Sequence, residues 1–309
     1  MTNVPYHIPA LLPQALEGLN IRPDGTYVDV TFGGGGHSKA ILELLSPSGR
    51  LCAFDQDAEA IANAPADERL TMIHGNFRYL TNYLRFEGVE WVDGLLGDLG
   101  VSFHHFDAAE RGFSFRADGP LDMRMNRSAA QSAAELLNTA TTERLTDILR
   151  LYGELQDAPR IARAIDRARQ AAPLVTVNDL LAVVSPLLNP KREKKDLACV
   201  FQALRIEVND EMGALRSLLE STLQVTRPGS RLAIITYHSL EDRMVKNFML
   251  SGNVEGREDV DFYGRRRTPW KLITSKPVTA SAAEVEANPR SRSAKLRVAE
   301  RITTITDHN

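Results

Sequence analysis

The first residues with recognisable chemistry in this 309-residue chain form a glycine cluster between an apolar run and a helical pattern. Gly33, Gly34, Gly35 and Gly36 follow YVDVTF and precede HSKAILELL. Glycine has no Cβ, so a ligand can approach the backbone closely, and the helix start adds free N–H groups and the positive dipole end. The cluster predicts a nucleotide-like or carboxylate-bearing ligand, with a purely structural turn as the alternative.

The glycine spacing does not fit a dinucleotide site. The pattern G-x-G-x-x-G requires a third glycine, but that position is occupied by Ser38 or Lys39, depending on which glycine begins the pattern. Asp55 ends the next apolar run, 19 residues beyond Gly36, where an acid can accept hydrogen bonds from ribose hydroxyls. An NAD(P) oxidoreductase is therefore an alternative that the missing glycine weakens.

Acids and a histidine also end two later apolar runs. Asp98 closes VDGLLGD, and His238 and Glu241 follow RLAIITY. In an open α/β sheet ligands bind at the carboxyl ends of the strands. A carboxylate there can take up a proton from a reacting group, which contributes about 10²–10⁴ in rate. Asp98 is the predicted base, with His238 and Glu241 as alternatives.

The elements that must position these residues alternate between strands and helices over the first hundred residues, as in a parallel α/β sheet. The predicted strands are 27–30, 50–54, 70–73, 92–96, 231–236, 270–274 and 294–299. The predicted helices between the early strands are 38–45, 57–63 and 77–86. The last strand alternates polar and apolar residues, which is typical of a strand with one solvated face.

The middle of the chain has helical patterns and no convincing strand, and predicts an inserted all-helical domain. The expected organisation is a first sheet part at 1–107, the helical insertion at 108–210, and a second sheet part with basic C-terminal strands at 211–309. Helices are predicted at 142–152, 160–169 and 177–184. Apolar residues at 197, 201, 204, 208, 212, 215 and 219 predict one helix from Asp196 onward.

Charge is low overall but unevenly distributed. Lys and Arg number 37 against 40 Asp and Glu, giving a net charge of −3, which excludes a polycation covered by nucleic acid. Between Tyr263 and Arg301, ten Lys or Arg residues face only three Glu. This segment is either a solvated tail or a strip that contacts phosphates.

The cysteines and the N-terminus indicate the compartment. Cys52 and Cys199 lie 147 residues apart with no CxxC motif, so neither a disulfide framework nor a metal site is expected. The chain has no basic leader and no run near about 18 apolar residues. We therefore expect a cytoplasmic protein with no membrane partner.

The glycine cluster, Asp55 and Asp98 together resemble the class I S-adenosylmethionine-dependent methyltransferases. Their cofactor contains adenosine and a carboxylate but no pyrophosphate, which suits the glycine pattern. The resemblance implies a Rossmann-like α/β sheet that binds S-adenosylmethionine, with Asp55 at the ribose, Phe77 beside the adenine and Asp98 beside the methyl donor.

Seven blocks between His7 and Arg301 resemble, more narrowly, the ribosomal RNA small-subunit methyltransferase H family, also called MraW. They are HIPALL, DVTFGGGGHS, DLGVS, RGFSFRADGPLDMRM, FQALRIEVN, HSLEDR and NPRSRSAKLR. The resemblance implies methyl transfer to the N4 exocyclic amine of a cytidine in the decoding region of bacterial 16S ribosomal RNA. The implied partner is this RNA or the small ribosomal subunit, and DNA is not expected.

The resemblance also implies a set of cofactor contacts, which fall on Gly35, Gly36, His37, Asp55, Phe77, Asp98 and His105. His105 departs from the family, which has glutamine there, and an imidazole with an unperturbed pKa of about 6.5 replaces only one amide hydrogen bond. Two alternatives stay open: a ribosome-assembly RNA-binding protein with a non-catalytic cofactor pocket, and a small-molecule methyltransferase, which would not use the basic segment.

Overall fold

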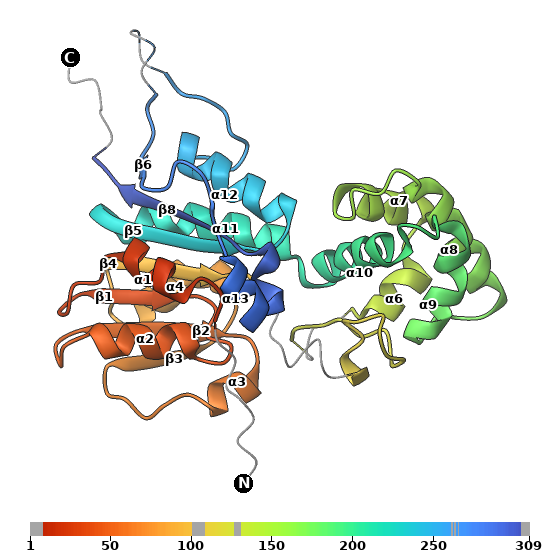
Figure 1. Cartoon of the computed structure of the whole chain (residues 1–309), viewed down its shortest axis with the longest axis horizontal. Helices are drawn as coiled ribbons and strands as arrows, with labels where there is room; N and C mark the ends of the chain where they lie inside the picture. Colours follow the sequence, from red (N-terminus) through yellow and green to blue (C-terminus); the bar gives the residue numbers. More distant parts are fainter. Residues whose placement is uncertain are drawn as a thin grey trace. The chain divides into compact units, whose positions relative to one another are not determined.

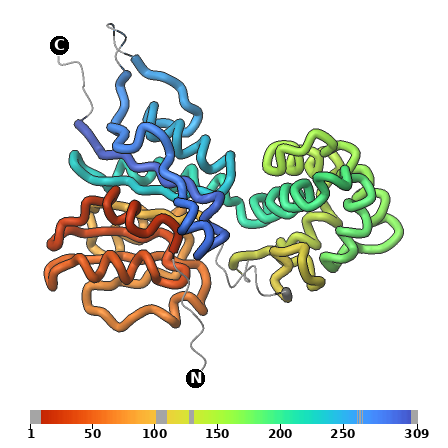
Figure 2. Tube along the Cα trace, viewed as in Figure 1, coloured from red at the N-terminus to blue at the C-terminus, as the bar shows by residue number. Residues whose placement is uncertain are grey.

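The computed structural model describes residues 9–100, 109–126, 131–260, 262, 264 and 266–303. The chain divides into two compact units: Met1–Gly100 with Gly213–Asn309, and Val101–Met212. The first unit is built from both ends of the chain, drawn in red to orange and in blue (Figure 2). It contains the sheet, whereas the described part of the second unit contains helices and one isolated bridge between Pro120 and Thr176 (Figure 1).

The sheet of the first unit has the strand order β3-β2-β1-β4-β5-β8-β6, and β7 also pairs with β8. Strands β1 to β5 run parallel, and β8 is antiparallel to its neighbours. The strand bounds are β1 Thr26–Asp29, β2 Arg50–Asp55, β3 Leu70–His74, β4 Val92–Asp98, β5 Thr226–Thr236, β6 Trp270–Leu272, β7 Val278–Thr279 and β8 Lys295–Arg301. The predicted α/β sheet is confirmed. Its strand order reverses between β1 and β4, where ligands bind in such sheets.

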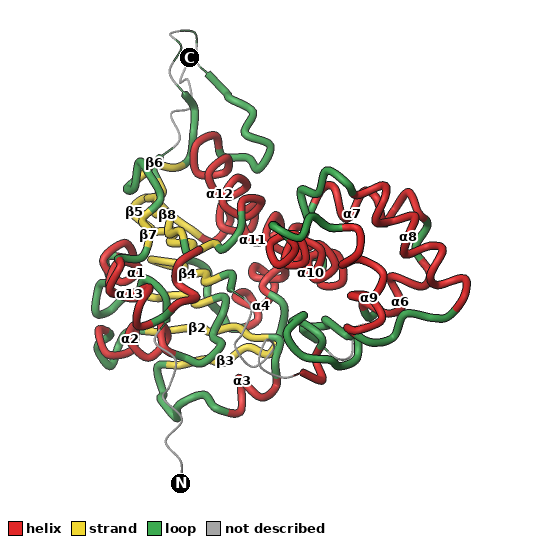
Figure 3. The backbone as a smooth tube through the Cα atoms, turned by 45° about the vertical axis from the view of Figure 1, so that its right-hand side comes forward, coloured by secondary structure: helices red, strands yellow, loops and turns green. Residues whose placement is uncertain are grey.

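Helices lie on this sheet and cover an apolar core (Figure 3). They are α1 Leu12–Leu19, α2 Gly36–Leu44, α3 Ala58–Ala62, α4 Leu80–Phe86 after the 3₁₀ turn η1 Phe77–Tyr79, most of α11 Glu211–Val225, α12 Ser239–Ser251 and α13 Ala282–Ala287. Helix α1 was not predicted, because the prolines around it read as breaks. Pro13 occupies the second helical position, where its missing N–H is not needed.

Strand β5 begins earlier than predicted. The predicted strand begins at Arg231, but residues 226–230 form an irregular extension in which Thr226 pairs with Val92 before Arg231 pairs with Gly94. Four residues of β5 therefore lie opposite Asp93 alone. The extra residues form a bulge, in which Gly229 adopts a φ of 93°.

Strand β8 does not have the solvated face that its alternation predicted. It lies between β5 on one side and β6 and β7 on the other, and its middle residues are buried. Arg297 is only 9% exposed because its guanidinium donates to Asp242 of α12 at 2.7 Å and 3.2 Å. Arg297 thus faces a helix and not water, whereas the Lys295 side chain is 41% exposed.

The second unit packs its helices around a separate apolar core that includes Leu145, Ile148, Ile161 and Leu180. The helices are α6 Ala133–Thr139, α7 Thr142–Leu151, α8 Ala158–Ala171, α9 Val177–Val184 and α10 Glu193–Asn209, with the 3₁₀ turns η2 Ala109–Arg111 and η3 Ser185–Leu187. Capping boxes start α6 and α9, because Ser132 pairs with Glu135 and Thr176 with Asp179.

The single helix predicted from Asp196 through position 219 is wrong. Helix α10 ends at Asn209 and α11 begins at Glu211, because Asp210 adopts the left-handed conformation with φ 46° and ψ 47°. The apolar spacing of three and four continues across this break, so periodicity alone did not reveal it. Among the described helices, none is long and apolar enough to cross a membrane.

Candidate active site

A relay of polar groups joins β1, α2 and β4 where the strand order reverses. Asp29 is fully buried and accepts hydrogen bonds from the Ser38 hydroxyl at 2.7 Å and the Thr31 amide at 3.0 Å. The Asp98 amide in turn donates to Thr31 Oγ1 at 2.7 Å. The relay therefore holds the end of β4 against the loop that starts α2.

The glycines of the turn differ in the space that surrounds them. A Cβ on Gly35 would lie 2.7 Å from the Phe32 ring, and one on Gly36 would lie 2.9 Å from Pro9, so packing excludes side chains there. Gly35 also has a φ of 74°. A Cβ on Gly34, in contrast, would meet no atom of the described residues within 4 Å. The backbone at Gly34 is thus open to a ligand.

Helix α2 presents unpaired backbone donors beside this turn. The Gly35 amide donates to Phe32 O at 2.7 Å, and Lys39 N donates to Gly35 O at 2.8 Å. The amides of Gly36, His37 and Ser38 donate to no partner within the described part of the chain. Free first-turn amides and the positive dipole end favour an anionic group, such as the carboxylate of an amino-acid ligand.

Asp55 and Phe77 lie at neighbouring strand ends. Asp55 accepts hydrogen bonds from the Gly33 amide at 2.8 Å and the Asp57 amide at 2.8 Å, and burial raises the pKa of its carboxyl group. Phe77 is half-buried and starts η1 after β3. The two loops are connected, because Asn76 Nδ2 donates to Gln56 Oε1 at 3.1 Å. A carboxylate and an aromatic ring thus lie on the same edge of the sheet.

Asp98, at the carboxyl end of β4, has an incompletely used carboxylate. Its Oδ1 is buried and has no hydrogen-bond partner among the described residues, and its Oδ2 lies 3.8 Å from His37 Nδ1. Burial raises the pKa of Asp98, while His37 and the nearby Tyr237 hydroxyl and Gly100 amide oppose this rise and Asp29 adds to it. A buried oxygen without a donor is the feature that an incoming N–H group would satisfy.

His37 connects Asp98 to the chain before α1. Its side chain is 5% exposed, and Nε2 lies 3.2 Å from the Ala10 carbonyl oxygen. A carbonyl oxygen only accepts, so this contact keeps a proton on Nε2 and leaves Nδ1 toward Asp98. His37 therefore borders the acid at Asp98 and does not merely fill the first turn of α2.

The alternative bases at the end of β5 are occupied in capping α12. Glu241 Oε2 accepts from the Tyr237 amide at 2.9 Å and the His238 amide at 3.3 Å. His238 Nε2 lies 3.1 Å from Glu241 Oε1, and His238 Nδ1 accepts the Glu241 amide at 3.4 Å. The backbone contacts of Glu241 Oε2 and His238 Nδ1 form a reciprocal cap of α12, whereas His238 Nε2 has no hydrogen-bond partner among the described residues.

Part of the predicted basic strip serves the fold. Lys295 and Arg297 pair with Asp242, and although burial opposes it, these cations lower the pKa of Asp242. The Arg301 guanidinium lies 5.7 Å from the centre of the Trp270 ring, and Arg266 pairs with Glu258. Lys271, Lys276 and Arg292 are exposed. The strip is therefore neither wholly a solvated tail nor wholly free for phosphates.

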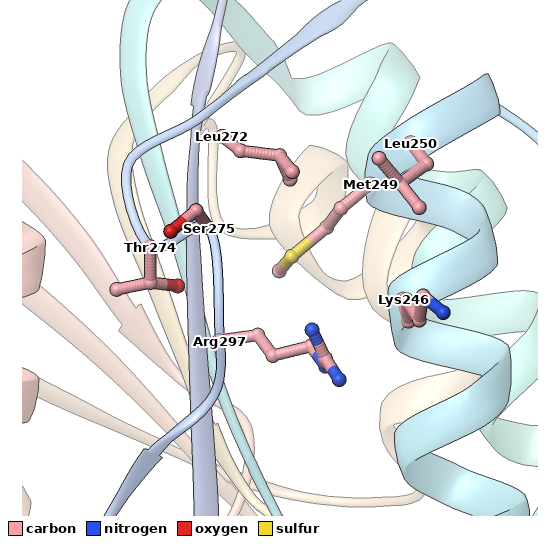
Figure 4. A pocket seen from close by; sticks show the side chains of 7 residues that line it. All are labelled: Lys246, Met249, Leu250, Leu272, Thr274, Ser275 and Arg297. Carbon is pink, nitrogen blue, oxygen red and sulfur yellow. The ribbon is translucent and has the colours of Figure 1, made fainter.

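A small cavity lies between α12, β6 and β8, away from the glycine turn. It has a volume of about 40 Å³ and is lined by Lys246, Met249, Leu250, Leu272, Thr274, Ser275 and Arg297 (Figure 4). Sites for drug-sized ligands measure about 300–1,000 Å³. This cavity has room for about one water molecule and is no candidate for a nucleoside cofactor.

The structure adds residues that sequence reasoning missed. Asp29 and Thr31 were noted only as the approach to the glycines, although a buried polar pair ending an apolar strand signals a hydrogen-bond relay. Tyr237, beside Asp98, was overlooked because it reads as the end of a buried strand. The predicted contact His105 lies outside the described residues and stays a prediction.

Comparison with known proteins identifies the family of the chain. The MraW methylase family profile matches residues 5–302. The ribosomal RNA small subunit methyltransferase H of Parabacteroides distasonis is 57% identical over 298 residues, covering 96% of this chain and 98% of that protein. The protein of that name from Porphyromonas gingivalis is 56% identical over 302 residues, covering 96% and 97%.

Among solved structures, an rRNA methylase from Streptococcus thermophilus aligns with a TM-score of 0.39 and 12% identity, covering 96% of this chain and 99% of that chain. The family match extends over almost the whole sequence and includes the glycine turn, Asp55 and Asp98. The chain therefore belongs to the MraW methylase family, whose members are S-adenosylmethionine-dependent methyltransferases.

Proposed function

We propose that this chain methylates the N4 exocyclic amine of a cytidine in the decoding region of 16S ribosomal RNA. The observation that carries the proposal is the buried Oδ1 of Asp98 at the switch point of the sheet, which has no hydrogen-bond partner among the described residues. The relatives named ribosomal RNA small subunit methyltransferase H support the RNA substrate. The substrate is either the free RNA or the small ribosomal subunit.

The cofactor site is proposed at the β1–α2 turn. The free amides of Gly36 and His37 would hold the carboxylate of S-adenosylmethionine, with Gly35 shaping the turn. Asp55 would accept from the ribose hydroxyls and Phe77 would border the adenine. The bound cofactor supplies an electrophilic methyl group on a sulfonium. Asp98 then lies where the donor end of such a ligand meets the substrate.

Asp98 is proposed to act on the amine. The lone pair of the N4 amine is delocalised into the base, so the amine needs an acceptor that orients it and receives charge from its N–H bonds. Oδ1 of Asp98 is free to accept one N–H, and the carboxylate can take the proton as the nitrogen gains the methyl group. Since the Asp98 amide is fixed on Thr31, the backbone that carries the carboxylate is held in place before the substrate arrives.

The cysteines favour nitrogen over ring-carbon methylation. Methylation at carbon 5 of cytosine proceeds through a covalent thiolate. Burial raises the pKa of the Cys52 thiol to about 11, and burial also raises the pKa of Cys199. Cys52 is fully buried in β2. Neither thiol suits a nucleophile, whereas an exocyclic amine attacks directly.

The test is methyl transfer to 16S ribosomal RNA and, in parallel, to purified small subunits, followed by mass spectrometry of the nucleosides. We expect N4-methylcytidine, mapped to the decoding region. A 5-methylcytidine product contradicts the proposed chemistry, and transfer to another RNA contradicts the substrate. Binding of both cofactor and RNA without transfer supports the alternative, a ribosome-assembly protein with a non-catalytic pocket.

A further inference from the structure

Three arginines form a stripe on α8 in the second unit. Arg160, Arg163 and Arg167 are exposed and are separated by three and four residues. At about 100° per residue, they fall within about 60° of the helix circumference. The buried residues of α8, which include Ile161 and Ile165, face α6, α7 and α9. The arginine stripe is thus the outer side of an amphipathic helix.

The arginine stripe differs from several other arginines of this unit. Arg169 of the same helix donates to Asp166 at 2.6 Å and to the Leu137 and Ala140 carbonyls at 2.7 Å each. Three exposed arginines elsewhere have acidic partners: Arg144 with Glu207, Arg150 with Asp147 and Arg192 with Asp196. Within the described residues, no member of the arginine stripe forms an ion pair. Three adjacent guanidinium groups therefore remain available to an external anion.

The chemistry of the arginine stripe favours a phosphate backbone. The chain has a net charge of −3, so attraction to a polyanion must come from local clusters of unpaired cations. Guanidinium groups bind phosphates through paired N–H donors. Protein interfaces are usually anchored by aromatic or apolar residues, and among the described residues of α8 no large hydrophobic side chain is exposed.

We propose that the arginine stripe binds phosphates of the ribosomal RNA substrate, an inference that rests on the proposed function. The stripe extends about 10 Å along the helix axis, at 1.5 Å per residue. Its three guanidinium groups can thus contact neighbouring phosphates of one strand. Such contacts position the RNA on the second unit and carry no sequence information.

The experiment compares RNA affinity as a function of salt for three forms of the full-length protein. They are the wild type, the stripe variant R160Q/R163Q/R167Q, and the control variant R144Q/R150Q/R192Q, which removes the same charge from arginines that already have partners. Each is titrated with 16S ribosomal RNA and with small subunits between 50 and 200 mM KCl. S-adenosylmethionine affinity and thermal unfolding are measured for each form.

Each phosphate contact contributes about 0.7–0.9 to the slope of log K against log salt, so the stripe variant should lose roughly 2–3 of that slope. Its affinity near 0.1 M salt should fall roughly 10²-fold. The control variant should keep both the slope and the affinity, and all three forms should bind the cofactor equally.

Three results overturn the inference. Equal losses of RNA affinity in both triple variants mean that total charge, and not the arginine stripe, determines binding. A stripe variant that binds RNA like the wild type removes the stripe from the interface. A variant that loses affinity for the subunit but not for free RNA assigns the stripe to a ribosomal protein. If the wild type binds the cofactor but no RNA, the proposed function itself fails.

Discussion

Strand β4 carries an aspartate near each end, and the two are placed in opposite environments. Asp93 is 9% exposed and accepts from the Thr26 amide at 2.9 Å, from Arg227 at 3.1 Å and from Arg22. Asp98 lies beside the Tyr237 hydroxyl and the Gly100 amide, whose hydrogen bonds lower its pKa, but its buried Oδ1 has no partner at hydrogen-bonding geometry in the described chain, and a histidine lies 3.8 Å from Oδ2. The Asp93 carboxylate thus has its hydrogen-bond donors within the protein, whereas the Asp98 carboxylate can still accept one.

This difference indicates how to separate structural from functional acids. Folding alone favours a buried carboxylate with enough donors, because a missing donor costs about 1–3 kcal/mol. The donors at Asp93 come from two segments, residues 22–26 and the start of β5, and hold the strand starts together. The missing hydrogen-bond donor at Asp98 Oδ1 lies at the carboxyl edge, where an N–H group of a substrate would supply it.

The largest expected effect comes from Asp98→Asn, which should lower the rate of methyl transfer by about 10²–10⁴. Because burial raises the pKa of Asp98, its ionised form opposes folding at neutral pH, so the variant should be as stable as the wild type or more so. Single-turnover rates and thermal unfolding measure both. Near-wild-type turnover would remove Asp98 as the base.

The second prediction compares a glycine variant at the carboxyl edge of the sheet with one at the opposite edge. Gly34→Ala places a methyl group into open space near the predicted cofactor, and should weaken S-adenosylmethionine binding about 5- to 150-fold without loss of stability. Gly94→Ala is the control, because its Cβ would lie 2.8 Å from the buried Tyr27 ring. It should lower stability by about 1–3 kcal/mol and spare cofactor affinity. Unchanged affinity in Gly34→Ala would make Gly34 a turn residue only.

The third prediction is Asp93→Asn, the same change at the opposite end of β4. It should lower the free energy of unfolding by about 1–3 kcal/mol, since Arg22 and Arg227 lose their shared carboxylate but remain partly solvated. Activity per folded molecule should stay unchanged. Denaturant unfolding and turnover at saturating cofactor test this, and a loss of turnover without a loss of stability would contradict the comparison.

The smallest effect is a pH dependence. Asp98 must be ionised to accept a proton, and its pKa is raised, mainly by burial. The acidic limb of kcat/KM should therefore lie above the ordinary aspartate value of about 3.9, and activity should fall as pH falls through it. A profile of kcat/KM against pH measures this limb. Finding it at or below the ordinary value would show that Asp98 does not titrate in a buried site.

Much of the sheet was predictable from the sequence, because β2 and β4 are short apolar runs between glycine and acidic residues, and hydrophobic burial is encoded locally. The position of Asp55 and Asp98 on one edge of the sheet was predictable, because parallel strands place their carboxyl ends together. The partners of polar residues were not predictable. That Glu241 caps α12 and that Arg297 pairs with Asp242 depends on which helix covers which strand.

The break at Asp210 was invisible for a different reason. A single left-handed residue leaves the apolar spacing on either side intact. The pattern of burial therefore continues, although the helix ends. The unpaired state of the arginine stripe was equally hidden, because helical spacing shows which face an arginine occupies but not whether a carboxylate of another helix reaches it.

The pairing of β4 with β5 has a consequence for the order of folding. Gly94 pairs with Arg231 and Asp98 with Ile235, so this ladder closes a loop that contains the whole second unit. The entropic cost of closure grows only with the logarithm of loop length, about 0.6 kcal/mol for each doubling, so the insertion is tolerated at equilibrium. Long-range pairing is nevertheless slow to form. We therefore expect the local β1–β2–β3 pairing to precede the β4–β5 ladder, which brings Tyr237 to Asp98 and completes the site in a late kinetic step.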